Sequence, residues 1–227
     1  MAEPTRRLAV VGGLGVSPAV RLSLPSRRLL AFLAVHGTEV PRSLVAGRLW
    51  ADVPEAQARA NVRRAIWQTP AGWVAADGDE LRLDAEVDLP ALHAAACAAI
   101  DGAALTLDEI ERLSVDLLPG WNEEWVLSPQ ESFHLLRVQA LEAACITMTA
   151  RGMHALATQA GTAALAADPL RESAAFALIR AHLQEGNRHA AAVRFRAFAR
   201  TLDEELGVEP DPRLSRLVHT AVTARSA

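Results

Sequence analysis

The sequence predicts a mainly α-helical protein, in which an N-terminal winged helix-turn-helix with small β-strands is followed by an α-helical, tetratricopeptide-like domain. Three observations predict this architecture. The residues before 88 are expected to form strands, then three helices, and then a hairpin. Almost all of the remainder has helical character, with a repeat of 34 residues. The two parts also differ in charge. We therefore expect two domains, over residues 1–87 and 88–227.

Short strands are expected over residues 6–24, where apolar residues alternate and glycines and a proline interrupt them. The alternating residues are Leu8, Val10, Val20, Leu22 and Leu24. A first helix should follow these strands. Ser26 is a suitable N-cap for it, and Gly37 is a suitable end.

Two further helices follow the first. The second begins near Pro41, and a first helical turn tolerates proline; its inward residues are expected to be Leu44, Val45, Ala46, Leu49 and Trp50. The third is expected over residues 56–68, because Thr69 and Pro70 stop it. On a helical wheel its apolar residues share one face, formed by Ala58, Val62, Ala65 and Ile66. The opposite face holds Gln57, Ala60, Arg64 and Trp67.

Residues 73–83 predict a β-hairpin. Two short apolar runs flank Asp77 and Gly78, and Asp-Gly is a strong turn signal between strands. A hairpin after three helices corresponds to the wing of a winged helix. In that fold the third helix enters the major groove of DNA, and the wing contacts the DNA backbone or the minor groove.

The rest of the chain predicts a run of helices with an internal repeat. The expected helices cover residues 88–101, 106–114, 129–151, 153–167, 170–185, 187–206 and 211–224. Gly152 and Gly186 lie 34 residues apart, as do Ala157 and Ala191. Each glycine falls between two helices, and alanine recurs where a close helix crossing needs a small side chain. A period of 34 in helix–turn–helix units is typical of tetratricopeptide repeats.

Polar side chains of the third helix are the candidate DNA-binding residues. Arginine can pair with guanine, asparagine and glutamine can pair with adenine, and all three can bind phosphate. The candidates are Arg63 and Arg64 first, then Asn61, Arg59 and Gln68, with Arg82 on the wing as a phosphate contact. An ordinary solvated face is the alternative, and it would be preferred for an isolated helix. The helix order, the hairpin and the charge favour DNA.

The charge distribution supports the same interpretation. Residues 1–71 hold ten arginines and four acidic residues, a net charge of +6, whereas residues 72–227 hold 13 arginines and 23 acidic residues, a net charge of −10. A basic front and an acidic rear indicate a module that faces nucleic acid, joined to one that does not. Chance clustering of surface arginines is the alternative.

The composition excludes several chemistries. The chain has no tyrosine, and all 23 basic residues are arginine, which excludes a P-loop lysine, a Schiff-base lysine and a Ser-Lys dyad. Two cysteines, Cys97 and Cys145, cannot form a four-ligand zinc cluster, and the histidines lack metal-binding spacing. We therefore expect no enzymatic activity, no cofactor and no metal. Glu123 and Glu124, between two tryptophans, are expected to fix a packing corner between the domains.

The location of the protein is also expected from the sequence. The N-terminus lacks the apolar core of a signal peptide, and no apolar run reaches membrane-spanning length. The sequence therefore predicts a reduced, cytoplasmic protein with no membrane partner.

Five segments of the chain resemble the AfsR/SARP-type bacterial transcriptional regulators. They are SRRLLAFLAVHG (26–37), LVAGRLWADVPEAQARANVRRAIWQ (44–68), DLLPGWNEEWV (116–126), AADPLRESAAFALIRAHLQEGNRHAA (166–191) and LDEELGVEPDPRL (202–214). Those regulators join an OmpR/PhoB-type winged helix to a helical bacterial transcriptional activator domain of tetratricopeptide character.

This resemblance implies a DNA-binding transcriptional activator. Members of the family bind direct repeats near a promoter and contact RNA polymerase, often at genes of secondary metabolism. The implied partners are double-stranded DNA, RNA polymerase and a second copy of the chain, as a homodimer on direct repeats. Larger relatives carry an additional ATPase domain, and we expect this chain to be a short, stand-alone form.

The chain departs from these relatives at the third helix. In relatives this helix usually continues through a leucine and paired arginines, whereas here TPAGWV (69–74) follows AIWQ (65–68) directly, about one helical turn earlier. Ala60 also leaves the middle of the outward face bare. The alternative function is therefore a non-enzymatic protein-interaction adaptor, whose degenerate winged helix does not read DNA.

Overall fold

The protein divides into two compact units, which are described separately. The computed structural model describes residues 5–37 and 39–223. The first unit contains Met1–Leu92 and Val115–Phe133, and the second contains His93–Ser114 and His134–Ala227.

The segment Val115–Phe133 belongs to the first unit because its backbone is bonded there. Leu118 N–H donates to Val10 O at 2.8 Å, and Gly12 N–H donates to Asp116 O at 2.8 Å. The sequence predicts residues 88–227 as one domain, whereas the compact units assign part of that range to the first unit. The structure differs because these hydrogen bonds join residues far apart in the chain, which leaves no local pattern to detect.

A three-stranded sheet lies at the start of the first unit, in the order β2 (Gly15–Ser17), β1 (Arg7–Ala9) and β6 (Glu86–Val87). β1 pairs antiparallel with β2 and parallel with β6. The expectation of strands over residues 6–24 is wrong beyond Ser17, since residues 18–23 are described and form no strand. Pro18 lacks a backbone donor, which ends the pairing.

Helix α1 (Leu24–His36) begins earlier than expected, because Ser23 and not Ser26 is its N-cap. Ser23 Oγ accepts a hydrogen bond from Ser26 N–H at 3.3 Å. Pro25 stands in the first turn, where no backbone N–H is needed. Gly37 ends the helix as predicted, with a φ of 103°.

Helices α2 (Arg42–Leu49) and α3 (Glu55–Gln68) follow where the sequence predicts them, and both pack against α1. The buried residues of this core include Leu29, Leu30, Phe32, Leu33, Val45, Leu49, Val62 and Leu81. Leu44, which was expected inside, is 42% exposed. α3 ends at Thr69, whose hydroxyl donates to Ala65 O at 2.8 Å.

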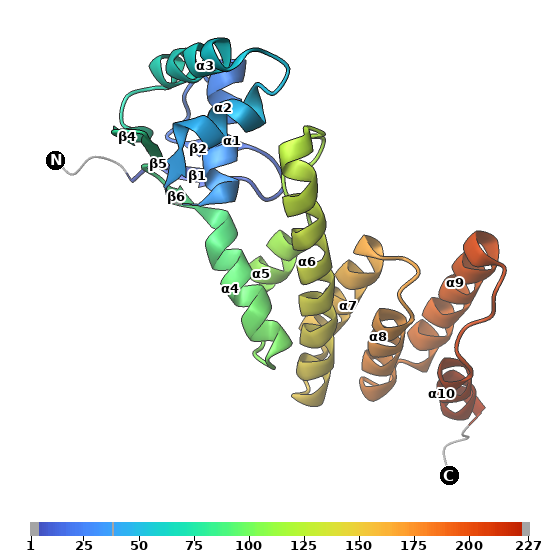
Figure 1. Ribbon diagram of the computed structural model, residues 1–227. Helices are drawn as coiled ribbons and strands as arrows, with labels where there is room; N and C mark the ends of the chain where they lie inside the picture. Colours follow the sequence, from blue (N-terminus) through green and yellow to red (C-terminus); the bar gives the residue numbers. More distant parts are fainter. Residues whose placement is uncertain (1–4, 38, 224–227) are drawn as a thin grey trace. The chain divides into compact units, whose positions relative to one another are not determined.

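The hairpin expected over residues 73–83 is present as the wing. β4 (Val74–Asp77) and β5 (Glu80–Leu83) pair antiparallel, and β5 also pairs with β3 (Val40–Pro41). Gly78 in the turn has a φ of 55°, which glycine adopts at no steric cost. Figure 1 shows the small sheets beside the three helices.

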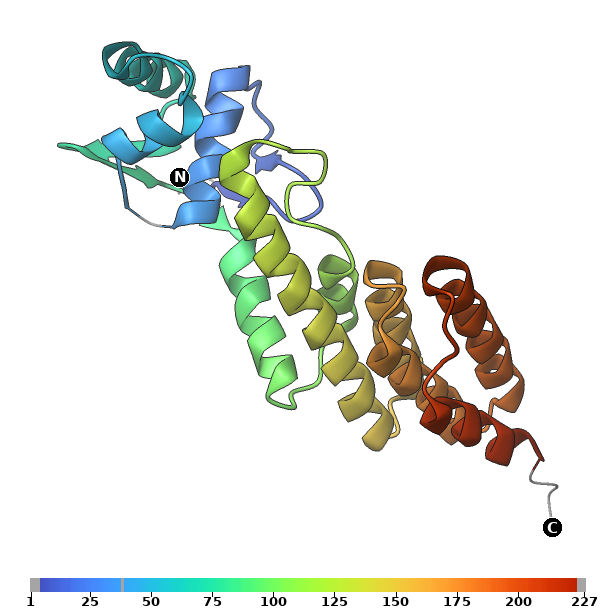
Figure 2. The ribbon, with the colours of Figure 1, turned by 45° about the vertical axis from the view of Figure 1, so that its right-hand side comes forward.

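The seven helices expected for the rest of the chain are all found. They are α4 (Asp88–Ile100), α5 (Leu107–Leu113), α6 (Glu124–Ala150), α7 (His154–Ala167), α8 (Glu172–Gln184), α9 (Arg188–Leu206) and α10 (Pro212–Thr223). α4 and α6 begin in the first unit and continue into the second. α6 starts before residue 129, where the sequence predicted it, so Pro129 lies inside the helix. Figure 2 shows α7, α8 and α9 side by side.

The repeat of 34 residues corresponds to successive helix pairs in the second unit. Gly152 and Gly186 precede α7 and α9 with φ values of 73° and 87°. Ala157 and Ala191, on these two helices, are fully buried. Gly161 on α7 has no room for a side chain, because a Cβ there would lie 2.9 Å from the sulfur of a cysteine on α6. A shared core joins α8, α9 and α10, formed by Ala175, Ile179, Ala191, Phe198, Leu202, Leu214 and Val218.

Candidate nucleic-acid interface

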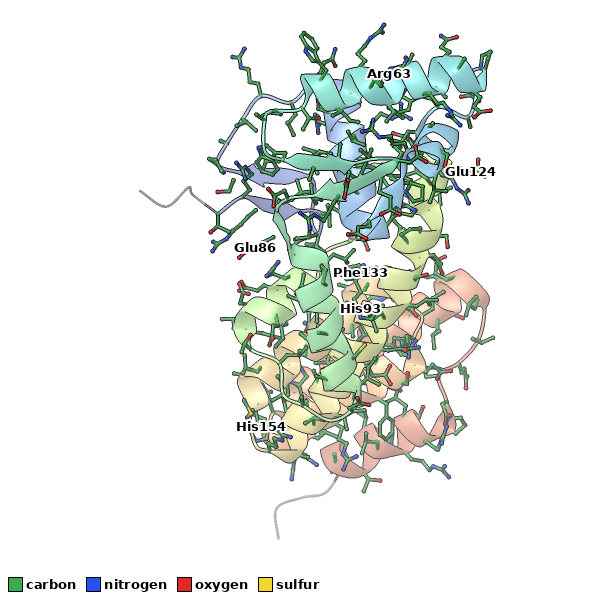
Figure 3. All side chains as sticks on the ribbon, turned by 60° about the vertical axis from the view of Figure 1, so that its left-hand side comes forward. Arg63, Glu86, His93, Glu124, Phe133 and His154 are labelled. Atoms are coloured by element: carbon green, nitrogen blue, oxygen red, sulfur yellow. The ribbon has the colours of Figure 1, made fainter. Side chains whose placement is uncertain are left out.

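Helix α3 has one buried face and one exposed face within the first unit. Its buried residues are Ala58, Val62 and Ala65. Arg59, Arg63 and Arg64 are exposed. Figure 3 shows Arg63 on α3, at the outer edge of this unit. The structure thus brings the three predicted arginines together on one accessible helix.

The three arginines of α3 are available for a new partner. Arg59 Nη2 lies 2.6 Å from Glu55 Oε1, one turn earlier, and both side chains are more than half exposed. Such a pair contributes little in water, so a DNA phosphate can replace the carboxylate. Arg63 and Arg64 form no ion pair with any residue that the structure describes.

The two predicted amide side chains are placed less favourably. Asn61 and Gln68 are both half-buried. Ser23 Oγ donates a hydrogen bond to Gln68 Oε1 at 2.8 Å, which ties the end of α3 to the N-cap of α1. A bidentate contact with adenine needs both the oxygen and the nitrogen of the amide. Gln68 is therefore a poor base reader in this arrangement.

A hollow of about 180 Å³ lies between α2, α3 and the wing turn. It is lined by Arg42, Ser43, Arg59, Val62, Arg63 and Asp79. Arg42 Nε is buried and has no hydrogen-bond partner. Three guanidinium groups against one carboxylate favour an anion as the occupant. Arg42 is not among the residues predicted from the sequence. Its place at the start of the second helix is nevertheless a usable signal, because helix N-termini attract anions.

The wing offers one cation and an acidic tip. Arg82 is exposed on β5, opposite Ala75. Asp77, Asp79 and Glu80 are exposed at the turn. Like charges repel, so these carboxylates oppose a close approach of the tip to DNA phosphates. A phosphate contact from the wing has to use Arg82.

Trp67 is a further candidate, which the sequence analysis placed on the outward face but did not select. It stands in the last turn of α3 and is 84% exposed. Tryptophan side chains are highly buried on average, so this exposure is unusual. A helical wheel shows the direction of a side chain, but not whether another element covers it.

Glu123 forms a packing corner that lies inside the first unit, and not between the two units as the sequence predicted. Arg28 Nε donates to Glu123 Oε1 at 2.9 Å, and Trp125 Nε1 donates to Glu123 Oε2 at 2.9 Å. The Trp125 side chain is 5% exposed, and its ring centroid lies 5.2 Å from that of Phe32. Arg28 Nη2 also donates to Leu49 O at 2.6 Å. The corner therefore braces α1 and α2 against the start of α6.

No group of three or more His, Cys, Asp or Glu residues within the described residues is placed to hold a metal ion. Burial raises the pKa of the Cys145 thiol to about 11, which keeps it protonated and unreactive. No described helix combines the length and the apolar character that a membrane crossing needs.

Comparison with known proteins gives a family and a fold. Residues 93–221, more than half of the chain, match the family model described as bacterial transcriptional activator domain. The chain is also similar to a solved structure described as Mycobacterium tuberculosis EmbR in complex with low affinity phosphopeptide. The TM-score is 0.64 at 21% sequence identity, and the match covers 99% of this chain and 67% of that one. This similarity confirms the predicted mainly α-helical fold. No curated protein matches the chain.

Proposed function

We propose that this chain, which belongs to the family of proteins with a bacterial transcriptional activator domain, activates transcription by binding double-stranded DNA. Its membership of that family confirms the resemblance noted in its sequence. One observation carries the DNA-binding part of this proposal. α3 buries its apolar face and exposes Arg59, Arg63 and Arg64. A helix with this division of faces is suited to a DNA groove.

In this proposal α3 lies in the major groove. Its 14 residues span about 21 Å, enough to cross a groove about 12 Å wide. Arg63 and Arg64 bind guanine edges or phosphates, with Asn61 as an additional base contact. Arg42 and Arg59 hold a phosphate at the hollow beside α3. Arg82 contacts the backbone from the wing, and Gln68 supports the helix end.

A single copy of α3 offers few base-reading side chains, which supports binding to direct repeats. Two copies in head-to-tail arrangement would double the contacts and add specificity. The family resemblance supports a promoter-proximal site and contact with RNA polymerase, without any enzymatic step. A protein that acts on the bacterial chromosome works in the cytoplasm.

The adaptor alternative is favoured by two observations. α3 ends at Gln68, so it has no further turn of base-reading residues. The acidic residues at the wing turn, Asp77, Asp79 and Glu80, oppose a phosphate contact there. In this alternative the winged helix serves only to support the helical second unit.

A DNA-binding titration separates the two functions. Fluorescence anisotropy with the DNA upstream of the protein's own coding sequence should show binding at low salt, weakening as the salt concentration rises. Arg63→Ala with Arg64→Ala should abolish it, and each single change should lower the salt slope by about one unit for every phosphate that the variant no longer binds. Thermal stability should stay nearly unchanged, because both side chains are exposed.

A matched control removes the same charge elsewhere. Arg180→Ala with Arg200→Ala takes two exposed arginines from the second unit, and this variant should bind DNA as the parent does. No binding of the upstream DNA at low salt would favour the adaptor. A double variant that binds like the parent would show that Arg63 and Arg64 of α3 do not carry DNA binding.

A further inference from the structure

One of the five tryptophans is exposed on the helix proposed to bind DNA. Trp67 is 84% exposed, whereas Trp73 and Trp125 are 2% and 5% exposed. The remaining two, Trp50 and Trp121, are half-buried. A large indole in water forgoes the favourable burial that the other tryptophans obtain. Such an exposed aromatic side chain suits contact with a partner.

The position of Trp67 on α3 relates it to the arginines. Residues three and four apart are neighbours on a helix surface, so Trp67 adjoins Arg64 and Arg63 on the exposed side. Ala60, a further turn back, has only a methyl group. Trp67 is therefore the large apolar side chain that α3 exposes, at one end of a basic face.

The two residues that follow Trp67 fix the end of α3 by hydrogen bonds. Gln68 accepts the hydrogen bond from Ser23 Oγ at 2.8 Å, and Thr69 N–H donates to Ala65 O at 3.0 Å. The Thr69 hydroxyl donates to the same carbonyl at 2.8 Å. The indole is thus presented by an ordered helix end and not by a frayed one, which a specific contact requires.

We infer that Trp67 is a specificity-determining residue that packs its indole on thymine methyl groups in the major groove. This inference rests on the proposed DNA binding by α3. Among the groups that base pairs present in the major groove, the thymine methyl is the apolar one. The arginines beside Trp67 can bind guanine or phosphate, so the indole adds a preference for thymine that they lack.

Thymine and uracil differ by that methyl group alone, which gives a direct test. The upstream DNA fragment is prepared once with thymine and once with uracil, and the affinities of the parent and Trp67→Ala are compared on both. The parent should bind the thymine fragment about fourfold more tightly for each methyl contacted. Trp67→Ala should bind both fragments equally, and Trp67→Phe should retain a reduced preference.

Control measurements separate a failure of the thymine preference from a failure of DNA binding by α3. The melting temperature of Trp67→Ala should match the parent, since the side chain is exposed. Binding by the parent with no thymine preference, or an undiminished preference in Trp67→Ala, overturns the inference and leaves the proposed function standing. Binding to neither fragment overturns both. If iodide fails to quench the fluorescence that Trp67 contributes without DNA, the indole is covered in solution, and the inference is again overturned.

Discussion

Ser23 Oγ lies 2.8 Å from Gln68 Oε1, so the N-cap of α1 is bonded to the last residue of α3. The same hydroxyl accepts the N–H of Ser26, and it therefore has two structural roles. One small side chain orders the start of a core helix and the end of the helix that carries the exposed arginines.

Ser23→Ala should lower the free energy of unfolding by about 1–2 kcal/mol, because it removes a helix cap and leaves Gln68 without this partner. Urea unfolding followed by circular dichroism measures the change. Ser128→Ala, at an exposed serine of α6, is the control and should leave stability unchanged. Equal stability of Ser23→Ala and the parent would show that the two bonds contribute nothing net.

Neutralising the tip of the wing should strengthen DNA binding. Asp77 and Glu80 are paired across the hairpin, and both are exposed. Asp77→Asn with Glu80→Gln removes two charges that repel phosphates, so the affinity at low salt should rise about two- to fivefold. Anisotropy titrations at two salt concentrations should show a smaller gain at high salt.

The control for the wing change lies in the second unit. Glu204→Gln with Glu205→Gln removes two exposed acidic charges from α9 and should leave DNA affinity close to that of the parent. Under the adaptor alternative the parent and both variants would show no DNA binding.

Stability should fall in mild acid through His36. Partial burial against the rings of Phe32 and Trp125 lowers the pKa of this imidazole, although one part of the side chain stays exposed. A hydrogen bond to Phe32 O opposes the shift, and the Arg48 charge adds to it. The unfolded chain then binds the proton more readily, so the His36 contribution is complete above about pH 6.5 and is lost as the pH falls through the lowered value.

The measurement is the melting temperature at about pH 7.5 and about pH 5.5. The difference should be smaller in His36→Gln than in the parent. Part of it should remain, because burial also lowers the pKa of His182. The same difference in both proteins would show that His36 protonation is not linked to unfolding.

A fragment of residues 88–227 should have a disturbed segment at Val115–Phe133. In the full chain Trp125 contacts Phe32, and Leu118 is bonded to Val10, and the fragment lacks both partners. Trp121 and Trp125 are the fragment's only tryptophans, so its fluorescence reports on this segment directly. The fluorescence emission of the fragment should lie at longer wavelength than that of Trp125 in the full chain. Iodide should also quench the fragment's tryptophans more readily than it quenches Trp125 in the full chain.

A second measurement tests whether the rest of the fragment is folded. The circular dichroism of the fragment should still show cooperative unfolding, because α8, α9 and α10 retain their shared core. A blue-shifted emission that resists quenching would mean that the segment folds without the first unit.

The sequence predicted the elements whose signals are local. The wing was predicted from an Asp-Gly pair between apolar runs, and the end of α3 from Thr69 and Pro70. The cap of α1 was misplaced by one turn, because Ser23 and Ser26 are equally good capping residues and Pro25 is compatible with the first turn. The order of helices in the second unit was also correct, since apolar periodicity and glycine stops are local signals.

The missed features depend on contacts between distant residues. The pairing of Val10 with Leu118 puts the segment after α5 into the first unit, and no residue pattern near either position indicates it. Arg42 was missed because its importance depends on Arg59 and Arg63 from another helix. The exposure of Trp67 likewise depends on the tertiary structure, since another helix or strand could have covered the indole. Periodicity identifies faces, but tertiary structure decides which faces remain open.

The close packing at Gly161 has a practical consequence for studying this protein. The Cys145 sulfur faces α7 where even a methyl group would clash, and its thiol is fully buried. Cys97, the other cysteine, is partly accessible. A maleimide dye should therefore couple at Cys97 alone, without any mutation. The native chain thus carries a built-in attachment point for a single fluorophore, and the second unit can be followed optically while DNA is added to the protein.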